Sequence, residues 1–200
     1  KIKLGTPDDE AIVRTIREET AQPLRVDANE GWTAPEAERK IRWLAAQGVE
    51  FVEQPLKRED IEGYRYLRGR SALPVIADES CLDARDIPKL AGLVDGINIK
   101  LMKCGGLREA LRMIHAARAH GLKVMMGCMV ETSVAITAAA HLAPLLDYAD
   151  LDGALLLADD PFAGARFEAG RLRMPERPGL GVVERAGTAG DDVARRNPEM

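Results

Sequence analysis

Residues 24–55 read "LRVDANEGWTAPEAERKIRWLAAQGVEFVEQP", and this stretch contains one complete strand–helix–strand pattern. The segments 24–29 and 49–55 are short runs with the composition of β-strands. Between them, residues 34–48 form an amphipathic pattern that ends at Gly48, and glycine is the residue that helix C-termini prefer. The stretch therefore predicts a βαβ unit, in which a helix joins two parallel strands.

The same pattern repeats along most of the chain. Further strand-like runs occupy residues 73–80, 95–103, 122–129 and 148–157, and further helical patterns occupy 106–121 and 131–146. A distinctive residue stands near the C-terminal end of each run, at intervals of 22 to 28 residues: Lys3, Asp27, Glu53, Asp78, Lys100, Cys128 and Asp152. This spacing predicts an α/β fold of the TIM-barrel type, whose active site is built at the C-terminal strand ends. The alternative, a doubly wound open sheet, normally has a glycine-rich first turn, and none is evident.

The composition is that of an ordinary globular protein. The 200 residues are 46% hydrophobic and 30% charged, with a formal net charge of -4. No apolar run approaches the roughly 18 residues that a membrane-spanning helix needs, so we expect no membrane partner and a cytoplasmic location. Mild acidity without a basic stripe argues against a nucleic-acid partner. The three scattered cysteines indicate a reducing compartment and are expected to be small buried residues: Cys81, Cys104 and Cys128.

Three successive strand ends carry carboxylates, namely Asp27, Glu53 and Asp78. Their side chains are expected to project into one sector of the barrel mouth. Three carboxylates cannot lie together unpaired, because like charges at close range drive protonation, and a divalent cation resolves this conflict. An all-oxygen set of ligands without His or Cys favours Mg²⁺ over Zn²⁺.

Lysines end two other strands. If Lys3 ends the second strand of the barrel and Lys100 the sixth, they lie on opposite sides of the mouth, with one lysine at each face of a substrate held on the metal. This geometry suits removal of a proton from one face of a carbon and return of a proton to the other. Lys1 should share a face with Lys3, and its like charge is expected to lower the pKa of Lys3. Lys103 is expected at the surface, because Lys100 directly ends the apolar run.

Five motifs resemble, in order and spacing, the enolase superfamily, specifically the subgroup that contains muconate cycloisomerases and dipeptide epimerases. They are "KIK" (1–3), "VDANEGW" (26–32), "VEQP" (52–55), "IADES" (76–80) and "INIKLMKCGG" (97–106). The resemblance implies a modified (β/α)7β barrel, closed at its mouth by a capping domain. It also implies Mg²⁺ as the cofactor and a role for six residues: metal ligands Asp27, Glu53 and Asp78, acid/base lysines Lys3 and Lys100, and auxiliary Lys1.

Seven strand ends are one fewer than a complete barrel has, and the sequence opens on a strand end. We therefore expect a fragment that lacks the N-terminal capping domain and the first strand. Barrel strands two to eight are expected within residues 1–153, a C-terminal segment that packs toward the capping domain within 154–185, and a disordered tail at 186–200. Within the C-terminal segment, Ala169 and Gly170 predict the turn of a hairpin.

The substrate is suggested by the run "YADLDG" (148–153), because strand alternation would place Asp150 and Asp152 on the same side. Two acids remote from the metal suit an ammonium group, and a molecule with a carboxylate at one end and an ammonium at the other is a dipeptide. Dipeptide epimerases carry a similar D-x-D. The stretch "GCMVETS" (127–133) resembles their preceding strand end, where Cys128 and Val130 would line the substrate pocket together with Lys1.

The resemblance thus implies a Mg²⁺-dependent isomerase that inverts the α-carbon of the C-terminal residue of a dipeptide, by proton transfer between two lysines through an enolate. N-succinylamino acid racemase, o-succinylbenzoate synthase and muconate cycloisomerase of the same subgroup remain alternatives, as does a non-catalytic Mg²⁺-binding barrel. A homo-oligomer is left open, and the side-chain preference for the dipeptide cannot be read without the capping domain.

Overall fold

The computed structural model describes residues 1–185, and its centre is a parallel sheet of seven strands. The strands of this sheet are β1 (Ile2–Lys3), β2 (Leu24–Asp27), β3 (Val49–Glu53), β4 (Val75–Ala77), β5 (Gly96–Lys100), β6 (Lys123–Gly127) and β7 (Tyr148–Ala149). The α-helices are α1 (Asp9–Glu19), α2 (Ala34–Ala46), α3 (Ile61–Leu67), α4 (Ile87–Leu90), α5 (Leu101–Cys104), α6 (Leu107–Ala119) and α7 (Ser133–Ala140), with 3-10 turns η1 (Ala143–Leu145) and η2 (Gly153–Leu156). The predicted alternation of strands and helices is confirmed.

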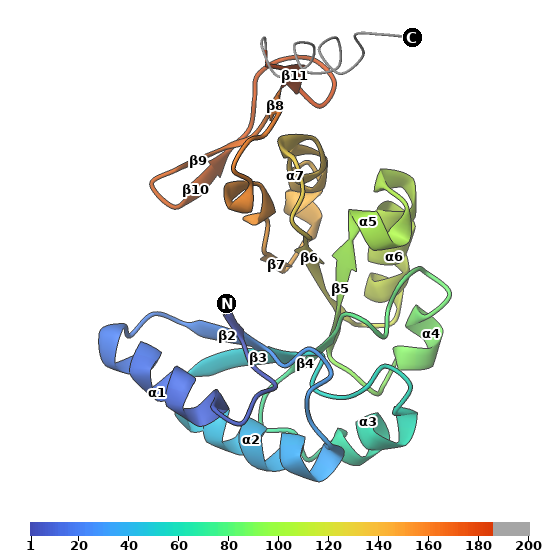
Figure 1. Ribbon diagram of the computed structural model, residues 1–200. Helices are drawn as coiled ribbons and strands as arrows, with labels where there is room; N and C mark the ends of the chain where they lie inside the picture. Colours follow the sequence, from blue (N-terminus) through green and yellow to red (C-terminus); the bar gives the residue numbers. More distant parts are fainter. Residues whose placement is uncertain (186–200) are drawn as a thin grey trace, which may run out of the picture.

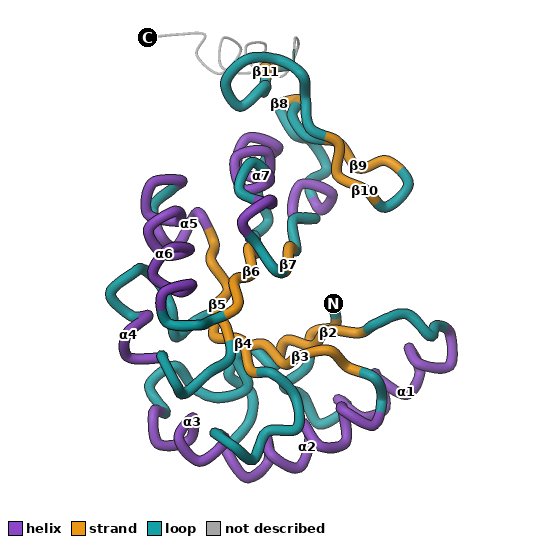
Figure 2. The backbone as a smooth tube through the Cα atoms, turned by 180° about the vertical axis from the view of Figure 1, so that it is seen from behind, coloured by secondary structure: helices purple, strands orange, loops and turns teal. Residues whose placement is uncertain are grey.

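The strands follow one another in the sheet in their sequence order, β1 to β7, and every pairing is parallel. Figure 1 shows the sheet strongly curled, with α1, α2 and α3 along its convex side, and Figure 2 shows the same arrangement from behind. The edges of the curl are β1 and β7, and they approach each other at the strand ends, where Lys1 Nζ lies 2.7 Å from Asp150 Oδ2. The prediction of a TIM-type α/β barrel portion is confirmed.

Two apolar layers stabilise the curled sheet. The larger one lies between the sheet and its helices and includes fully buried residues such as Val26, Ile41 and Leu44. The smaller one packs Phe51, Ile76 and Met125 against Tyr148. Because alternate residues of a strand face the same way, Phe51 lies on the same face of β3 as Glu53. The smaller cluster is therefore the layer beneath the carboxyl ends of the strands.

Three of the predicted strand ends lie beyond the strands. β4 ends at Ala77, β6 at Gly127 and β7 at Ala149, so Asp78 and Cys128 are one residue past a strand and Asp152 is three residues past one. The run 148–157 was expected to be a strand, but the 3-10 turn η2 begins at Gly153 and ends the extended backbone. The predicted strand 95–103 is also too long, because the helix α5 begins at Leu101, directly after Lys100.

The C-terminal part of the described chain contains four short strands in two antiparallel pairs. These are β8 (Phe162–Ala163), β9 (Arg166–Glu168), β10 (Arg171–Arg173) and β11 (Val183–Glu184), with β9 paired to β10 and β8 to β11. The predicted hairpin turn is confirmed, since Ala169 and Gly170 separate β9 from β10 with left-handed φ angles of 48° and 74°. The expected packing of 154–185 toward a capping domain stays a prediction, and the tail 186–200 lies outside the described residues.

Within residues 1–185, no helix combines the length and the apolar character needed to cross a membrane. The three cysteines are free thiols, but only Cys81 is buried. The expectation that all three are buried is wrong for Cys104 and Cys128, which are partly exposed. Both follow a strand end closely, Cys104 as the last residue of α5 and Cys128 directly after β6.

Candidate active site

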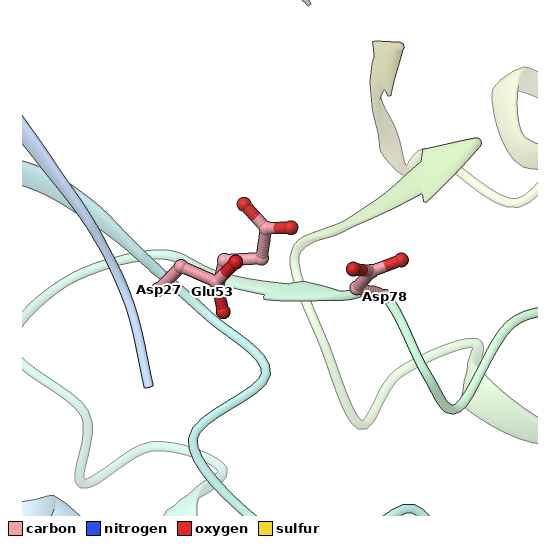
Figure 3. A group of neighbouring side chains, drawn as sticks. All are labelled: Asp27, Glu53 and Asp78. Carbon is pink, nitrogen blue, oxygen red and sulfur yellow. The ribbon is translucent and has the colours of Figure 1, made fainter. Parts of the chain in front are cut away.

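Three acidic side chains meet at the carboxyl ends of neighbouring strands. Asp27 and Glu53 are the last residues of β2 and β3 and lie opposite each other in the pairing register, and Asp78 follows β4 directly. All three are fully buried, and one carboxylate oxygen of each lies within 4.8 Å of the others. Figure 3 shows them side by side along the strand ends. The structure thus brings together all three predicted metal ligands.

Glu53 is held in place by a residue that the sequence analysis missed. Asn98 on β5 is fully buried, and its Nδ2 donates a hydrogen bond of 2.7 Å to Glu53 Oε1. Gly127 makes room for this contact, since a Cβ at that position would lie 2.7 Å from Asn98 Nδ2. The signal was present in "INIK", because a polar residue two positions before Lys100 faces the same side of the strand.

The two predicted acid/base lysines flank the acidic cluster. Lys3 Nζ, from β1, donates to Asp27 Oδ2 at 2.6 Å, and Lys100 Nζ, from β5, lies 2.7 Å from Asp78 Oδ2. β2, β3 and β4, which carry the carboxylates, lie between these two strands in the sheet. The Lys3 side chain is 61% exposed, whereas that of Lys100 is only 8% exposed. The lysines therefore approach the cluster from its two ends.

Lys1 contacts carboxylates on three strands or strand ends. Its Nζ lies 2.9 Å from Glu53 Oε2, 3.6 Å from Asp27 Oδ2 and 2.7 Å from Asp150 Oδ2. Burial alone would lower the pKa of Lys1, but Glu53 and Asp150 raise it above its usual value. In this structure the charge of Lys1 is offset by these acids, and its predicted effect on Lys3 stays a prediction.

Lys103 is not at the surface, so its expected position was wrong. Its Nζ forms an ion pair with Asp78 Oδ1 and donates to the Asp78 main-chain carbonyl at 3.0 Å, and its side chain is only 14% exposed. The reason is that α5 begins at Leu101. One helical turn returns position i+3 to the same side as position i, so Lys103 joins Lys100 at Asp78. The i, i+3 spacing in "KLMK" was the signal for this contact.

The electrostatics differ strongly within the acidic cluster. Burial and the negative charge of Asp27 raise the pKa of Glu53 to about 7, although Lys1 opposes the shift. At Asp78 burial acts in the same direction, but the ammonium groups of Lys103 and Lys100 outweigh it and hold the pKa below its usual value. The pKa of Lys100 is correspondingly raised by Asp78, against the effect of burial.

The predicted ammonium-binding acids are placed differently from each other. Asp150 is partly buried and bound to Lys1, which connects it to the carboxylate cluster. Asp152 is exposed, and its Oδ1 lies 4.0 Å from Cys128 Sγ. The expectation that strand alternation places Asp150 and Asp152 on the same side does not apply. The strand β7 ends at Ala149, and Asp152 has helical backbone angles. Val130 is 60% exposed and lines an apolar groove of about 470 Å³ between α5 and α7, whose lining does not include Asp27, Glu53 or Asp78.

The residues present fit a hard divalent cation. Three buried carboxylates converge, each offering oxygen, and the group contains neither His nor Cys. Within the described part of the chain, this is the one group of three such side chains that could hold a metal ion. Four ammonium groups from Lys1, Lys3, Lys100 and Lys103 lie against the same carboxylates. In this structure these four positive charges balance the three negative charges of the carboxylates.

The sequence of the chain was compared with models of known protein families. A model described as "Enolase C-terminal domain-like" matches residues 1–186. The chain belongs to this family. The predicted membership of the enolase superfamily is confirmed.

Within the enolase C-terminal domain-like family, the chain is similar to several dipeptide epimerases. It is 50% identical over 184 residues to the L-Ala-D/L-amino acid epimerase of a Maribacter species, which covers 92% of this chain and 55% of the relative. A solved structure of the dipeptide epimerase from Enterococcus faecalis, complexed with Mg and the dipeptide L-Leu-L-Tyr, is 43% identical and has a TM-score of 0.84, covering 91% of this chain and 54% of the other. The chain spans about half the length of these relatives.

A third similar protein is named for a different class of substrate. The N-succinyl Arg/Lys racemase of Bacillus cereus is 31% identical, with a TM-score of 0.85, and the match covers 92% of this chain and 53% of the racemase. Among the structures similar to this chain, one is thus named for dipeptides and another for N-succinyl Arg/Lys.

Proposed function

We propose that the protein is a Mg²⁺-dependent dipeptide epimerase that inverts the α-carbon of the C-terminal residue of its substrate. The observation that carries the proposal is the pair of lysines, Lys3 and Lys100, that approach a buried carboxylate cluster from its two ends. A structural cluster would need counter-charges but not one lysine on each side. The similarity to named dipeptide epimerases supports the same conclusion.

The proposed reaction exchanges one proton for another at a single carbon. One lysine, with its Nζ neutral, takes the α-proton from one face, and the other, as an ammonium, gives a proton to the opposite face. Lys3 and Lys100 exchange these roles when the reaction runs in reverse. Asp27, Glu53 and Asp78 would hold Mg²⁺, whose charge, when bound, stabilises the negative charge that develops on the substrate carboxylate.

Asp150 and Asp152 are proposed to bind the N-terminal ammonium group of the dipeptide. Support for Asp150 comes from its existing contact with an ammonium group, that of Lys1, at 2.7 Å. Support for Asp152 comes from its exposed position beside Cys128, which is proposed to line the pocket together with Lys1 and Val130. A cytoplasmic location and a homo-oligomeric state stay predictions, as do the side chains that the enzyme prefers.

The test is an isotope-exchange assay of the full-length protein in D2O. Free dipeptides should gain one deuterium at the α-carbon of the C-terminal residue, detected by mass. Replacing Lys3 by Ala should abolish exchange from one epimer, and replacing Lys100 by Ala should abolish exchange from the other. Lys57→Ala, which changes an exposed lysine after β3, is the matched control and should leave both exchanges unchanged. Wild-type exchange of both epimers by both variants would contradict the two-base mechanism.

The N-succinylamino acid racemase is the second candidate, favoured by the similarity to the N-succinyl Arg/Lys racemase. N-acetylation of the dipeptide distinguishes the two candidates, because it removes the ammonium. For an epimerase, N-acetylation should weaken transition-state binding by roughly 2–5 kcal/mol in the wild type, with little further loss in Asp152→Asn. Faster turnover of N-acylated substrates than of free dipeptides would replace the epimerase assignment by the racemase assignment.

A further inference from the structure

Gln54 is a fully buried polar residue next to the predicted metal ligand Glu53, and every polar atom of its side chain is hydrogen-bonded. Its Oε1 accepts from the main-chain N–H of Asp78 at 2.8 Å and from that of Ser80 at 3.2 Å. Its Nε2 donates to the Leu56 carbonyl at 2.9 Å and to Ser80 Oγ at 2.8 Å. One side chain thus fixes the backbone of the segment that follows β4.

The backbone of Gln54 explains why a side chain is needed there. Its N–H still donates to the Ile76 carbonyl at 2.8 Å, as a strand residue would, but its φ of 36° lies in the left-handed region. Its carbonyl accepts instead from Glu30 N, in the loop after β2, at 2.8 Å. If the parallel pairing of β3 with β4 continued, that carbonyl would accept from the main-chain N–H of the residue after Ala77, which is Asp78. The Gln54 amide oxygen takes over this position.

Gln54 therefore links the three segments that carry the carboxylates. It follows Glu53 in the chain, its main-chain carbonyl holds the loop after Asp27, and its side chain holds the amide of Asp78. The regular pairing of β4 ends at Ala77, so this amide has no strand partner. Left-handed non-glycine residues are uncommon and gather at functional sites.

We propose that Gln54 is a positioning residue for the metal site, which sets Asp78 relative to Glu53 so that the carboxylates converge before a cation binds. The inference rests on the proposed function only in taking Asp27, Glu53 and Asp78 as Mg²⁺ ligands. Residues that orient metal ligands typically contribute about 10–100-fold to metal affinity. Within the described residues, the hydrogen bonds of the Gln54 side chain go to Leu56, Ser80 and the Asp78 amide rather than to the carboxylates, so Gln54 acts through the Asp78 backbone.

The test measures the Mg²⁺ dissociation constant by titration calorimetry on the full-length protein, at a temperature where each variant is fully folded. Gln54→Met, of similar length but without hydrogen-bonding groups, should weaken Mg²⁺ binding about 10–100-fold. Ser80→Ala is the matched control, because it removes one partner of Nε2 and keeps the bond from Asp78 N–H to Oε1. It should bind Mg²⁺ nearly as well as the wild type.

A second variant separates positioning from general stability. Gln54→Glu keeps the acceptor for the Asp78 amide but loses both amide donors, so it should be less stable than the wild type and still bind Mg²⁺ at least as tightly. Should Gln54→Met not fold, Gln54→Asn, which is one methylene too short to reach Asp78, carries the same expectation. Equal Mg²⁺ affinity in wild type and Gln54→Met, or equally weakened binding in Gln54→Glu, would overturn the inference. A wild-type protein that binds no Mg²⁺ would instead overturn the proposed metal site.

Discussion

Asp9 and Glu53 are both buried carboxylates, with exposed fractions of 3% and 0%, but their environments shift their pKa values in opposite directions. Burial acts against the charged form of Asp9, but Lys40 Nζ at 2.6 Å and Trp32 Nε1 at 2.8 Å donate to its Oδ2 and outweigh that effect. Two main-chain amides bind its Oδ1. The pKa of Asp9 is therefore lowered.

Glu53 has fewer donors and two acidic neighbours. Asn98 and Lys1 donate to it, but Asp27 and Asp78 lie close by, and burial together with the charge of Asp27 raises its pKa to about 7. The difference teaches that burial alone does not mark a functional acid. A buried acid with a complete set of donors ties loops together, whereas one crowded by like charges is suited to bind a cation.

The largest expected effect comes from Glu53→Gln. Loss of one of three carboxylates should reduce dipeptide exchange by at least about 1000-fold, and Mg²⁺ binding should fall with it. The free energy of unfolding, measured by urea denaturation with EDTA present, should stay level or rise, because one of the repelling charges is gone. A clear loss of metal-free stability would show that Glu53 resembles Asp9 after all.

The reverse pattern is expected for Asp9→Ala. Removing this acid leaves Lys40 and the Trp32 indole short of a buried partner, so the free energy of unfolding should fall by about 3 kcal/mol. Mg²⁺ affinity of the folded protein should not change. Glu10→Ala on the same helix is the control, since within residues 1–185 Glu10 forms ion pairs with the exposed Arg14 and Arg39 and should contribute less than about 1 kcal/mol. Equal losses in the two variants would contradict the comparison.

A smaller effect is expected from Gly127→Ala, which tests the support of Glu53. The added methyl would lie 2.7 Å from Asn98 Nδ2 and must displace the side chain that donates to Glu53. Mg²⁺ binding should weaken about tenfold, as for other residues that orient a ligand. Gly121→Ala, in the turn before β6, is the control: no atom lies within 4 Å of the added Cβ, but the left-handed φ of 71° strains an alanine. This variant should lose stability, and calorimetry at a temperature where it is folded should find its Mg²⁺ affinity unchanged.

The smallest expected effect is a change in stability at low pH. Because the pKa of folded Asp9 is lowered, its contribution to stability is complete above the unfolded value near 3.8 and is lost as the pH falls through the folded pKa. The stability difference between wild type and Asp9→Ala should therefore narrow between pH 5 and pH 2, as measured by urea denaturation. A difference that is independent of pH would mean that packing, rather than the charge of Asp9, stabilises this region.

The sequence predicted best those residues whose position depends on a strand. Asp27, Glu53 and Lys100 end strands, so the regular spacing and the alternation of side chains placed them correctly. Asp78, one residue past its strand, was also placed at the cluster, although the hydrogen bond from its amide to Gln54 could not be foreseen.

Residues beyond the strands could not be placed by the same reasoning. Lys103 returns to the site because a helix starts directly after Lys100, and Asp152 departs from strand alternation because a 3-10 turn follows. Gln54 lay inside the predicted strand segment 49–55, but its backbone is left-handed, and its main-chain carbonyl accepts from Glu30 in the loop after β2. Side-chain periodicity holds within an element, whereas these positions depend on backbone angles that the sequence pattern does not encode.

The order of the strands has a consequence for how the protein is made. Each strand pairs with the one synthesised just before it, so a folding chain closes only short loops and the entropic cost of each step stays small. A growing chain can dock one strand at a time as it leaves the ribosome. Asp27, Glu53 and Asp78 all precede β5 in the sequence. The three segments that carry the acidic cluster can therefore pair while β6 and β7 have still to emerge from the ribosome.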